Sequence, residues 1–269
     1  MIQRWLTVST VLCCVLPGRA AHAWGPVAHV AVTSRAIDAL SGSLKDFYKN
    51  HRVEMPTLSP EPNFTEEGQE RRFAVDRLLP FPFTDLPRTE AALKERYGDE
   101  AGKVGRLPWL IQESYGRLLT AYKSGEKDKI LAESDVLGGL VADMSDPLAC
   151  TDNADGQKTE QHGLWVRFTI RFPEAYQRSL HLSPEPARYL DDPKDYVFAM
   201  MRAAYIWVDN ILYQEDLAHR ASSGYGEIYY EALATRASSI LKGQLSNAAT
   251  DVGSYWYTAW TAAGRPELK

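Results

Sequence analysis

Hydrophobic residues recur at intervals of three and four positions along most of the chain, a spacing typical of helices with one apolar side. The clearest segments start at Pro26, at Leu107 and near Lys127. The same spacing predicts further helices in Leu44–His51, from Thr89, in Val197–Leu212 and in Ile228–Leu241, and a closing helix anchored in the core by Trp256 and Trp260. Together these segments predict an all-α protein, a single-domain multi-helix bundle.

The segment from Lys127 to about Asp146 carries a carboxylate inside its apolar stripe. The stripe consists of Val136, Leu137, Leu140, Val141 and Met144. Asp143 lies within it. Because an unpaired charge in a protein core is costly, we expect Asp143 to have a buried partner, which could be a metal ion.

Two glycines, Gly138 and Gly139, interrupt the middle of the same helix. Each costs about 1 kcal/mol of helix stability relative to alanine. Two explanations are open. Either another helix approaches closely at this point, or a large side chain has been lost from it.

The first 23 residues have the features of a secretory signal peptide. Arg4 gives a basic start, Trp5–Leu16 is an apolar run too short for a stable membrane anchor, and Ala21-His22-Ala23 fits a small-x-small cleavage site. We therefore expect an exported protein, periplasmic or extracellular, that is cut near Ala23. Residues 24–269 would form the mature domain, with Trp24 as its amino terminus. The alternative is an N-terminal anchor that is not cleaved.

The mature chain would be acidic and would contain a single cysteine. The full sequence has 30 Lys and Arg against 35 Asp and Glu, and loss of Arg4 and Arg19 leaves 28 against 35, a net charge of −7. This balance disfavours nonspecific binding to nucleic acid or to an anionic membrane. Cys150 cannot form an internal disulfide, and we expect it to be a small buried side chain rather than a nucleophile.

Two motifs in order carry a family resemblance. Residues 139–149 read GLVADMSDPLA, and residues 153–157 read NADGQ. This order resembles the signature region of the zinc-dependent phospholipase C and single-strand nuclease superfamily, in which a His-x-x-x-Asp helix runs into a Pro-Leu-His corner and an Asn-x-Asp-Gly-Gln loop. Gly139 and Ala149 stand where the family has histidines. The resemblance covers most of the mature chain and implies a helical scaffold.

In that family the free amine and carbonyl of an amino-terminal tryptophan bind one zinc ion, helped by a histidine on the first helix and by the shared aspartate. Trp24, His29 and Asp143 match these positions. The resemblance therefore implies at most one residual zinc ion, bound by these three residues. Without the resemblance, His29 is an ordinary polar residue of a helix.

The other two metal subsites of the family have lost ligands. One retains only Asp143 and the other is empty. The substituted positions are Asn63, Arg72 and Gly139 in the first, and Ala149, Trp165 and Thr169 in the second. Arginine and tryptophan do not ligate metals. Arg72 could instead neutralise Asp143 or Asp76 without a metal, or Arg71-Arg72 could be a solvated pair. An alignment shifted through the loop would make His162 a ligand.

Hydrolysis of a phosphodiester by a metal cluster needs a bound hydroxide and cations on both the attacking and the leaving oxygen. One residual site supplies only part of this. We therefore expect a non-catalytic or altered-activity member of the family, whose vestigial cleft still takes an unidentified ligand. The alternative is an active single-metal phosphodiesterase acting on phospholipid or nucleic acid, in which Arg72 and Asp143, with Asp152 or Asp155, contact the phosphate.

Overall fold

The computed structural model describes residues 23–59 and 69–268, and these residues form helices and turns but no β-strand. The all-α prediction is therefore confirmed for the described part of the chain. The segment before Ala23 and the position Asn63 lie outside it, so the predictions made for them stay predictions. Among the described helices, none combines the length and the apolar character that a membrane crossing requires.

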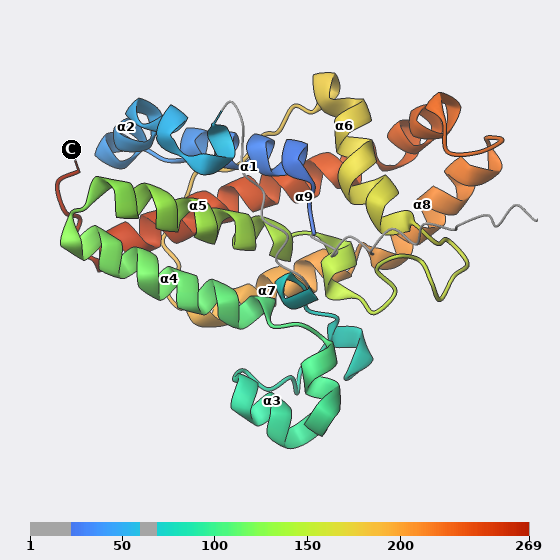
Figure 1. The fold of residues 1–269 in the computed structure, drawn as a ribbon, viewed down its shortest axis with the longest axis horizontal. Coiled ribbons are helices and arrows are strands. Elements are labelled where there is room, and N and C mark those ends of the chain that lie inside the picture. The colour runs from blue at the N-terminus through green and yellow to red at the C-terminus, as the bar shows by residue number, and fades with distance from the viewer. Residues whose placement is uncertain (1–22, 60–68, 269) are drawn as a thin grey trace, which may run out of the picture.

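The longest helix, α9 (Glu227–Ala262), runs through the centre of the bundle (Figure 1). It packs against α1 (Pro26–Ala39) and α5 (Lys127–Met144), and α4 (Leu107–Ser124) packs alongside α5. These helices begin at the residues that the apolar stripes predict for α1, α4 and α5. The central layer of the core therefore follows directly from the sequence pattern.

Shorter helices surround this centre. They are α2 (Gly42–Asn50), α3 (Glu90–Tyr97), α6 (Phe172–Tyr176), α7 (Pro193–Tyr205) and α8 (Val208–Arg220). A π-helical turn, Val166–Arg171, leads into α6, and α3 lies apart from the main bundle in Figure 1. Thr89 caps α3 by accepting the N–H of Ala92 at 3.2 Å, which explains why a helix begins after this threonine.

Three expectations about helix faces are wrong. The continuous face predicted for Val197–Leu212 is interrupted, because the chain leaves α7 through Ile206 and Trp207 before α8 begins, and Ile206 is 57 % exposed. Val136 is 47 % exposed because it lies at the edge of the α5 stripe, and Ile228, on the first turn of α9, is 63 % exposed. Spacing alone does not show where a stripe reaches the surface.

Helices α5 and α9 approach each other closely at Gly138. A Cβ atom on this residue would lie 3.3 Å from side-chain atoms of both Trp256 and Val252 of α9. Trp256 is fully buried, as predicted, and donates from its indole nitrogen to the Ser134 carbonyl of α5 at 2.9 Å. Trp260, predicted as a second anchor, is only partly buried. The close approach of a second helix therefore explains one of the two glycines.

An extended segment, the strap (residues 183–190), is fixed to α9 by four side-chain hydroxyls, which accept backbone N–H groups of the strap at 2.9 to 3.1 Å. The acceptors are Ser246, Thr250, Ser254 and Thr258, and the donors, in the same order, are Ser183, Glu185, Arg188 and Leu190. Because the acceptors are spaced at intervals of four residues, they share one face of the helix. The strap is thus held in place although it has no regular structure of its own.

Candidate functional site

Asp143, on the last turn of α5, is fully buried between two basic side chains. The imidazole Nε2 of His29, on the first turn of α1, lies 3.0 Å from Oδ1. On the other side Arg71 places Nη2 at 2.6 Å and Nε at 2.7 Å from Oδ2. The structure thus brings together two of the predicted zinc ligands, His29 and Asp143, and adds a guanidinium to them.

Gly139 leaves room beside this guanidinium. It lies one turn before Asp143 on α5, and a Cβ atom on it would be 3.2 Å from Nη2 of Arg71 and 3.9 Å from the imidazole of His29. A side chain at this position would therefore point at the group that now contacts Asp143. Of the two explanations for the glycine pair, close helix packing therefore fits Gly138, and a lost side chain fits Gly139.

The surroundings of Asp143 keep its carboxylate ionised at neutral pH. Burial alone would raise the pKa of Asp143, but the charges and hydrogen bonds of Arg71 and His29 outweigh burial and hold the pKa below its usual value. Asp135, two turns earlier on α5, accepts the N–H of Thr57 at 3.2 Å, and burial raises its pKa. Since both oxygens of Asp143 face nitrogen atoms of basic side chains, its negative charge is compensated within the protein.

Arg72, which the sequence placed at this position, points elsewhere. Its Nη2 donates to the carbonyl of Thr151 at 2.9 Å. Burial lowers the pKa of Arg72, and the nearby carboxylates of Asp152 and Asp76 offset only part of this effect. Asp76 in turn accepts the Thr151 hydroxyl at 2.6 Å and the Asp152 N–H at 2.7 Å. The arginine that compensates Asp143 is therefore Arg71, and Arg72 fastens the loop that follows α5.

The two aspartates predicted to contact phosphate are engaged within that loop. Asp152 forms ion pairs with Lys158 at 2.9 Å and with Arg77 at 3.2 Å. Asp155 accepts the backbone N–H groups of Gly163 at 3.0 Å and Trp165 at 3.3 Å. No contact joins either carboxylate to Asp143 among the described residues. The loop is therefore organised around its own acidic side chains.

Trp24 reaches the same end of α5 through its side chain. The indole is 1 % exposed, and its nitrogen donates to the hydroxyl of Ser145, two residues after Asp143, at 3.1 Å. The next residue, Gly25, donates its N–H to the Thr169 carbonyl at 3.0 Å. In the described chain the nitrogen of Trp24 is a peptide amide, because Ala23 precedes it; only cleavage after Ala23 would make it an amine.

The positions of the third family subsite are part of the packed interior. Ala149 is 4 % and Trp165 is 7 % exposed, and the Thr169 hydroxyl donates to the Trp165 carbonyl at 2.8 Å. His162, the alternative ligand, has an exposed side chain, and its carbonyl accepts from Arg167 at 2.7 Å. Cys150 is a buried free thiol, as expected, and burial raises its pKa well above the usual value.

The described side chains around Asp143 do not by themselves complete a zinc site. Zinc is held by several N, O or S donors, usually four. The described residues contain no group of three or more His, Cys, Asp or Glu side chains arranged to hold a metal. The third neighbour of the carboxylate is Arg71, whose guanidinium is always cationic and offers no lone pair. These side chains can hold and orient a carboxylate, and a zinc ion at this place would need the amine and carbonyl of a cleaved Trp24 as further donors.

A second buried ion pair, which sequence reasoning missed, joins the π-helical turn to α8 and α9. Arg167 contacts Oε1 of Glu215 through Nη2 at 2.8 Å and Nε at 2.9 Å, and Tyr229 donates to the same oxygen at 2.9 Å. Gln161 donates to Oε2 at 2.6 Å, and the guanidinium carbon lies 3.9 Å from the centre of the Tyr225 ring. The signal was present in the sequence, because Glu215 occupies a position of the apolar stripe of α8.

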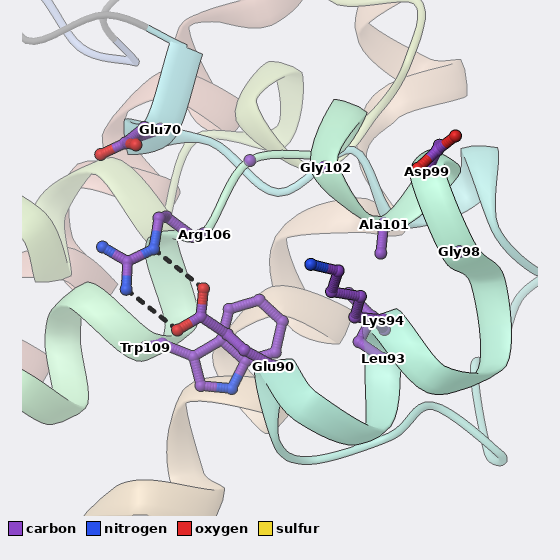
Figure 2. A pocket seen from close by; sticks show the side chains of 11 residues that line it. Glu70, Glu90, Leu93, Lys94, Gly98, Asp99, Ala101, Gly102, Arg106 and Trp109 are labelled. Atoms are coloured by element: carbon purple, nitrogen blue, oxygen red, sulfur yellow. Dashed lines mark hydrogen bonds and ion pairs between the residues drawn. The ribbon is translucent and has the colours of Figure 1, made fainter.

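A pocket of about 410 Å³ lies between α3, the turn Gly98–Lys103 and the start of α4 (Figure 2). At its wall Arg106 makes a two-point contact with Glu90, at 2.9 Å for each nitrogen, and another contact at 2.9 Å with Glu113. Lys94 extends into the pocket in Figure 2. Because two carboxylates already neutralise Arg106, these ion pairs fasten α3 to α4 and do not form an anion site.

No family model and no curated protein matches this chain. The resemblance to the phospholipase C and nuclease superfamily therefore rests on the sequence motifs alone, and the function that it implies is a proposal.

Proposed function

We propose that this protein is an exported, non-catalytic member of the phospholipase C and nuclease-like scaffold, which acts by binding rather than by hydrolysis. The observation that carries the proposal is the contact of two Arg71 nitrogens with Asp143, beside the space left by Gly139. A fixed cation supplied by the chain compensates the shared aspartate. The proposal that the protein is exported rests on the signal-like features of the first 23 residues.

The chemistry at Asp143 argues against phosphodiester hydrolysis. The metal-cluster reaction needs a metal-bound hydroxide as nucleophile and positive charge on the attacking and leaving oxygens. A guanidinium stabilises negative charge, but it cannot generate hydroxide at neutral pH. Asp143 is a poor general base, because Arg71 and His29 hold its pKa below the usual value and thereby stabilise its ionised form.

The first test is the metal content and activity of purified mature protein that begins at Trp24. We expect well below one zinc ion per chain by elemental analysis, and no hydrolysis of bis(p-nitrophenyl) phosphate above background, with or without added zinc. One zinc per chain that is lost in both His29→Ala and Asp143→Ala would overturn the proposal in favour of a single-metal site. Two or three zinc ions with measurable hydrolysis would restore the enzyme interpretation.

The second test rebuilds the site. In a double variant, Arg71→Ala with Gly139→His, the guanidinium is removed and an imidazole is placed beside His29 and Asp143. We expect this variant to gain zinc binding in isothermal titration calorimetry, while wild type does not bind. The matched control is Arg72→Ala with Gly139→His, which keeps Arg71 and should not bind. Equal zinc binding by the two double variants would show that Arg71 does not occupy the metal position.

A further inference from the structure

A second pocket, of about 370 Å³, lies between the strap, α7 and α9, and its two walls differ in character. α7 contributes Ala199, Met200 and Ala203, whereas α9 contributes Gln244, Asn247 and Asp251. The volume falls in the range of small-molecule sites, roughly 300–1,000 Å³. An apolar wall facing a few polar groups is the usual composition of such sites.

The polar wall carries a carboxylate that is mostly buried. Tyr196 donates to Oδ1 of Asp251 at 2.8 Å, and Arg188 donates to the Tyr196 oxygen at 2.7 Å. Among the described residues, Tyr196 gives the only hydrogen bond that Asp251 receives, so Oδ2 remains for a ligand. Burial raises the pKa of Asp251 to about 6, which leaves the group ionised at about pH 7.5.

We propose that this pocket binds a small amphipathic amine, with its ammonium group between Asp251 and Glu185 and its apolar body against Met200 and Ala203. All four of these residues line the same pocket. The one cation among its described lining residues is Arg188, which donates to Tyr196 and whose charge compensates part of the negative charge of Asp251.

Charge and position both support a cation as the occupant. Two carboxylates against one arginine leave an excess of negative charge in the pocket, which favours a positively charged group there, and the net charge of −5 on the full chain attracts cations at longer range. The inference does not rest on the proposed function, because neither Asp143 nor Arg71 lines the pocket. A result on zinc or hydrolysis therefore leaves it untouched.

The experiment compares three probes that share a phenyl ring and a short linker: 2-phenylethylamine, 2-phenylethanol and 3-phenylpropanoate. Each is titrated into the purified protein at about pH 7.5, and binding is followed by ligand-observed NMR. We expect the amine to bind most tightly. Asp251→Asn keeps an oxygen acceptor for Tyr196 but removes the charge, and it should weaken amine binding about tenfold with little effect on the alcohol.

Two further variants separate the pocket from general effects. Ala203→Phe adds bulk at an exposed position of the pocket wall and should weaken the binding of every probe. Asp209→Asn removes an exposed carboxylate of α8 outside the pocket and should change nothing. Circular dichroism checks that all variants keep the helical fold. Equal affinity for amine and alcohol, a preference for the carboxylate, or amine binding that Asp251→Asn and Ala203→Phe leave unchanged would each overturn the proposal.

Discussion

Among the described residues, two arginine–carboxylate pairs with a buried carboxylate share their chemistry but not their surroundings. Arg71 meets Asp143, and Arg167 meets Glu215, in each case through two guanidinium nitrogens at 2.6 to 2.9 Å. The carboxylate side chains are 0 % and 1 % exposed. Since desolvation can cancel the attraction of a buried ion pair, the other contacts of each pair decide what it contributes.

These other contacts differ. Arg167 also donates to the carbonyls of His162 at 2.7 Å and Gln161 at 3.0 Å, and its side chain is 8 % exposed. The Arg71 side chain is 17 % exposed, and Gly139 beside it leaves room for a further side chain. The comparison shows how one pair type serves two purposes. The Arg167 pair holds the π-helical turn, α8 and α9 together. Arg71, in contrast, occupies a position beside Asp143 and Gly139 that a different side chain could also occupy.

The largest loss of stability should come from breaking the Arg167–Glu215 pair. Glu215→Leu leaves Arg167 as an uncompensated buried charge, and we expect a loss of about 3–5 kcal/mol in the free energy of unfolding. Urea denaturation followed by circular dichroism measures it. The control is the adjacent Asp216→Asn, which breaks an exposed pair with Arg220 and should cost less than about 1 kcal/mol. Similar losses in the two variants would show that the Arg167–Glu215 pair does not hold these segments together more strongly than an exposed pair.

Removal of Arg71 should cost less, because His29 still contacts Asp143. For Arg71→Met we expect a loss of about 2–4 kcal/mol at neutral pH. The control Arg72→Met removes a neighbouring arginine that donates to a backbone carbonyl, and it should cost about 0.5–1.5 kcal/mol. A larger loss in Arg72→Met than in Arg71→Met would contradict the assignment of Arg71 to Asp143.

The loss in Arg71→Met should also depend on pH. The folded pKa of Asp143 lies below its usual value, so the stability that Arg71 provides is fully present above about pH 4 and disappears as the pH falls through the folded pKa. The difference between wild type and Arg71→Met should therefore shrink in acid. A difference that stays constant down to about pH 2 would mean that Arg71 acts by packing alone.

Asp146 shows what a carboxylate does in the same region without a cation. It is fully buried, its Oδ1 accepts the Leu148 N–H at 2.9 Å, and Oδ2 has no hydrogen-bond partner among the described residues. Burial, followed by the charge of Asp143, raises its pKa to about 8, although the Leu148 hydrogen bond acts in the opposite direction. Unlike Asp143, this side chain therefore stays protonated at neutral pH.

Asp146→Asn should stabilise the protein in a pH-dependent way. The unfolded chain gives up the Asp146 proton near pH 4 and the folded chain only near pH 8, so wild-type stability falls as the pH rises through this window. Asparagine does not titrate. We therefore expect no gain below about pH 4 and a gain at pH 8 of several kcal/mol, up to about 5 kcal/mol, measured by urea denaturation across the range. A gain that is equal at both ends would contradict the raised pKa.

The sequence predicts the helices of the core well because their apolar stripes are long and regular. It does not predict which of two adjacent arginines meets Asp143, because a one-residue change in the turn before Phe73 exchanges Arg71 and Arg72, and no periodic pattern constrains that turn. The position of Glu215 in the apolar stripe of α8 indicates that it is buried, but its partner Arg167 lies 48 positions away, and no local pattern identifies that partner. The sequence does not predict the position of the strap for the same reason, because the strap is held by hydroxyl groups of α9 and not by residues of its own segment.

The smallest effects should come from the glycine pair, where the sequence left two explanations open. In Gly138→Ala the new methyl group meets buried side chains of α9 at 3.3 Å, so we expect a net loss of about 1 kcal/mol despite the better helix propensity of alanine. In Gly139→Ala the nearest atom, at 3.2 Å, is the end of the flexible Arg71 side chain, which can shift.

The gain in helix propensity, up to about 1 kcal/mol, should then make Gly139→Ala neutral or stabilising. Thermal unfolding of the two variants side by side measures the contrast, and each serves as the control for the other. A stabilised Gly138→Ala would show that α5 and α9 can accommodate a methyl group at this position without strain. A strongly destabilised Gly139→Ala would mean that Arg71 is fixed as rigidly as Arg167. That result would contradict the difference proposed between the two pairs.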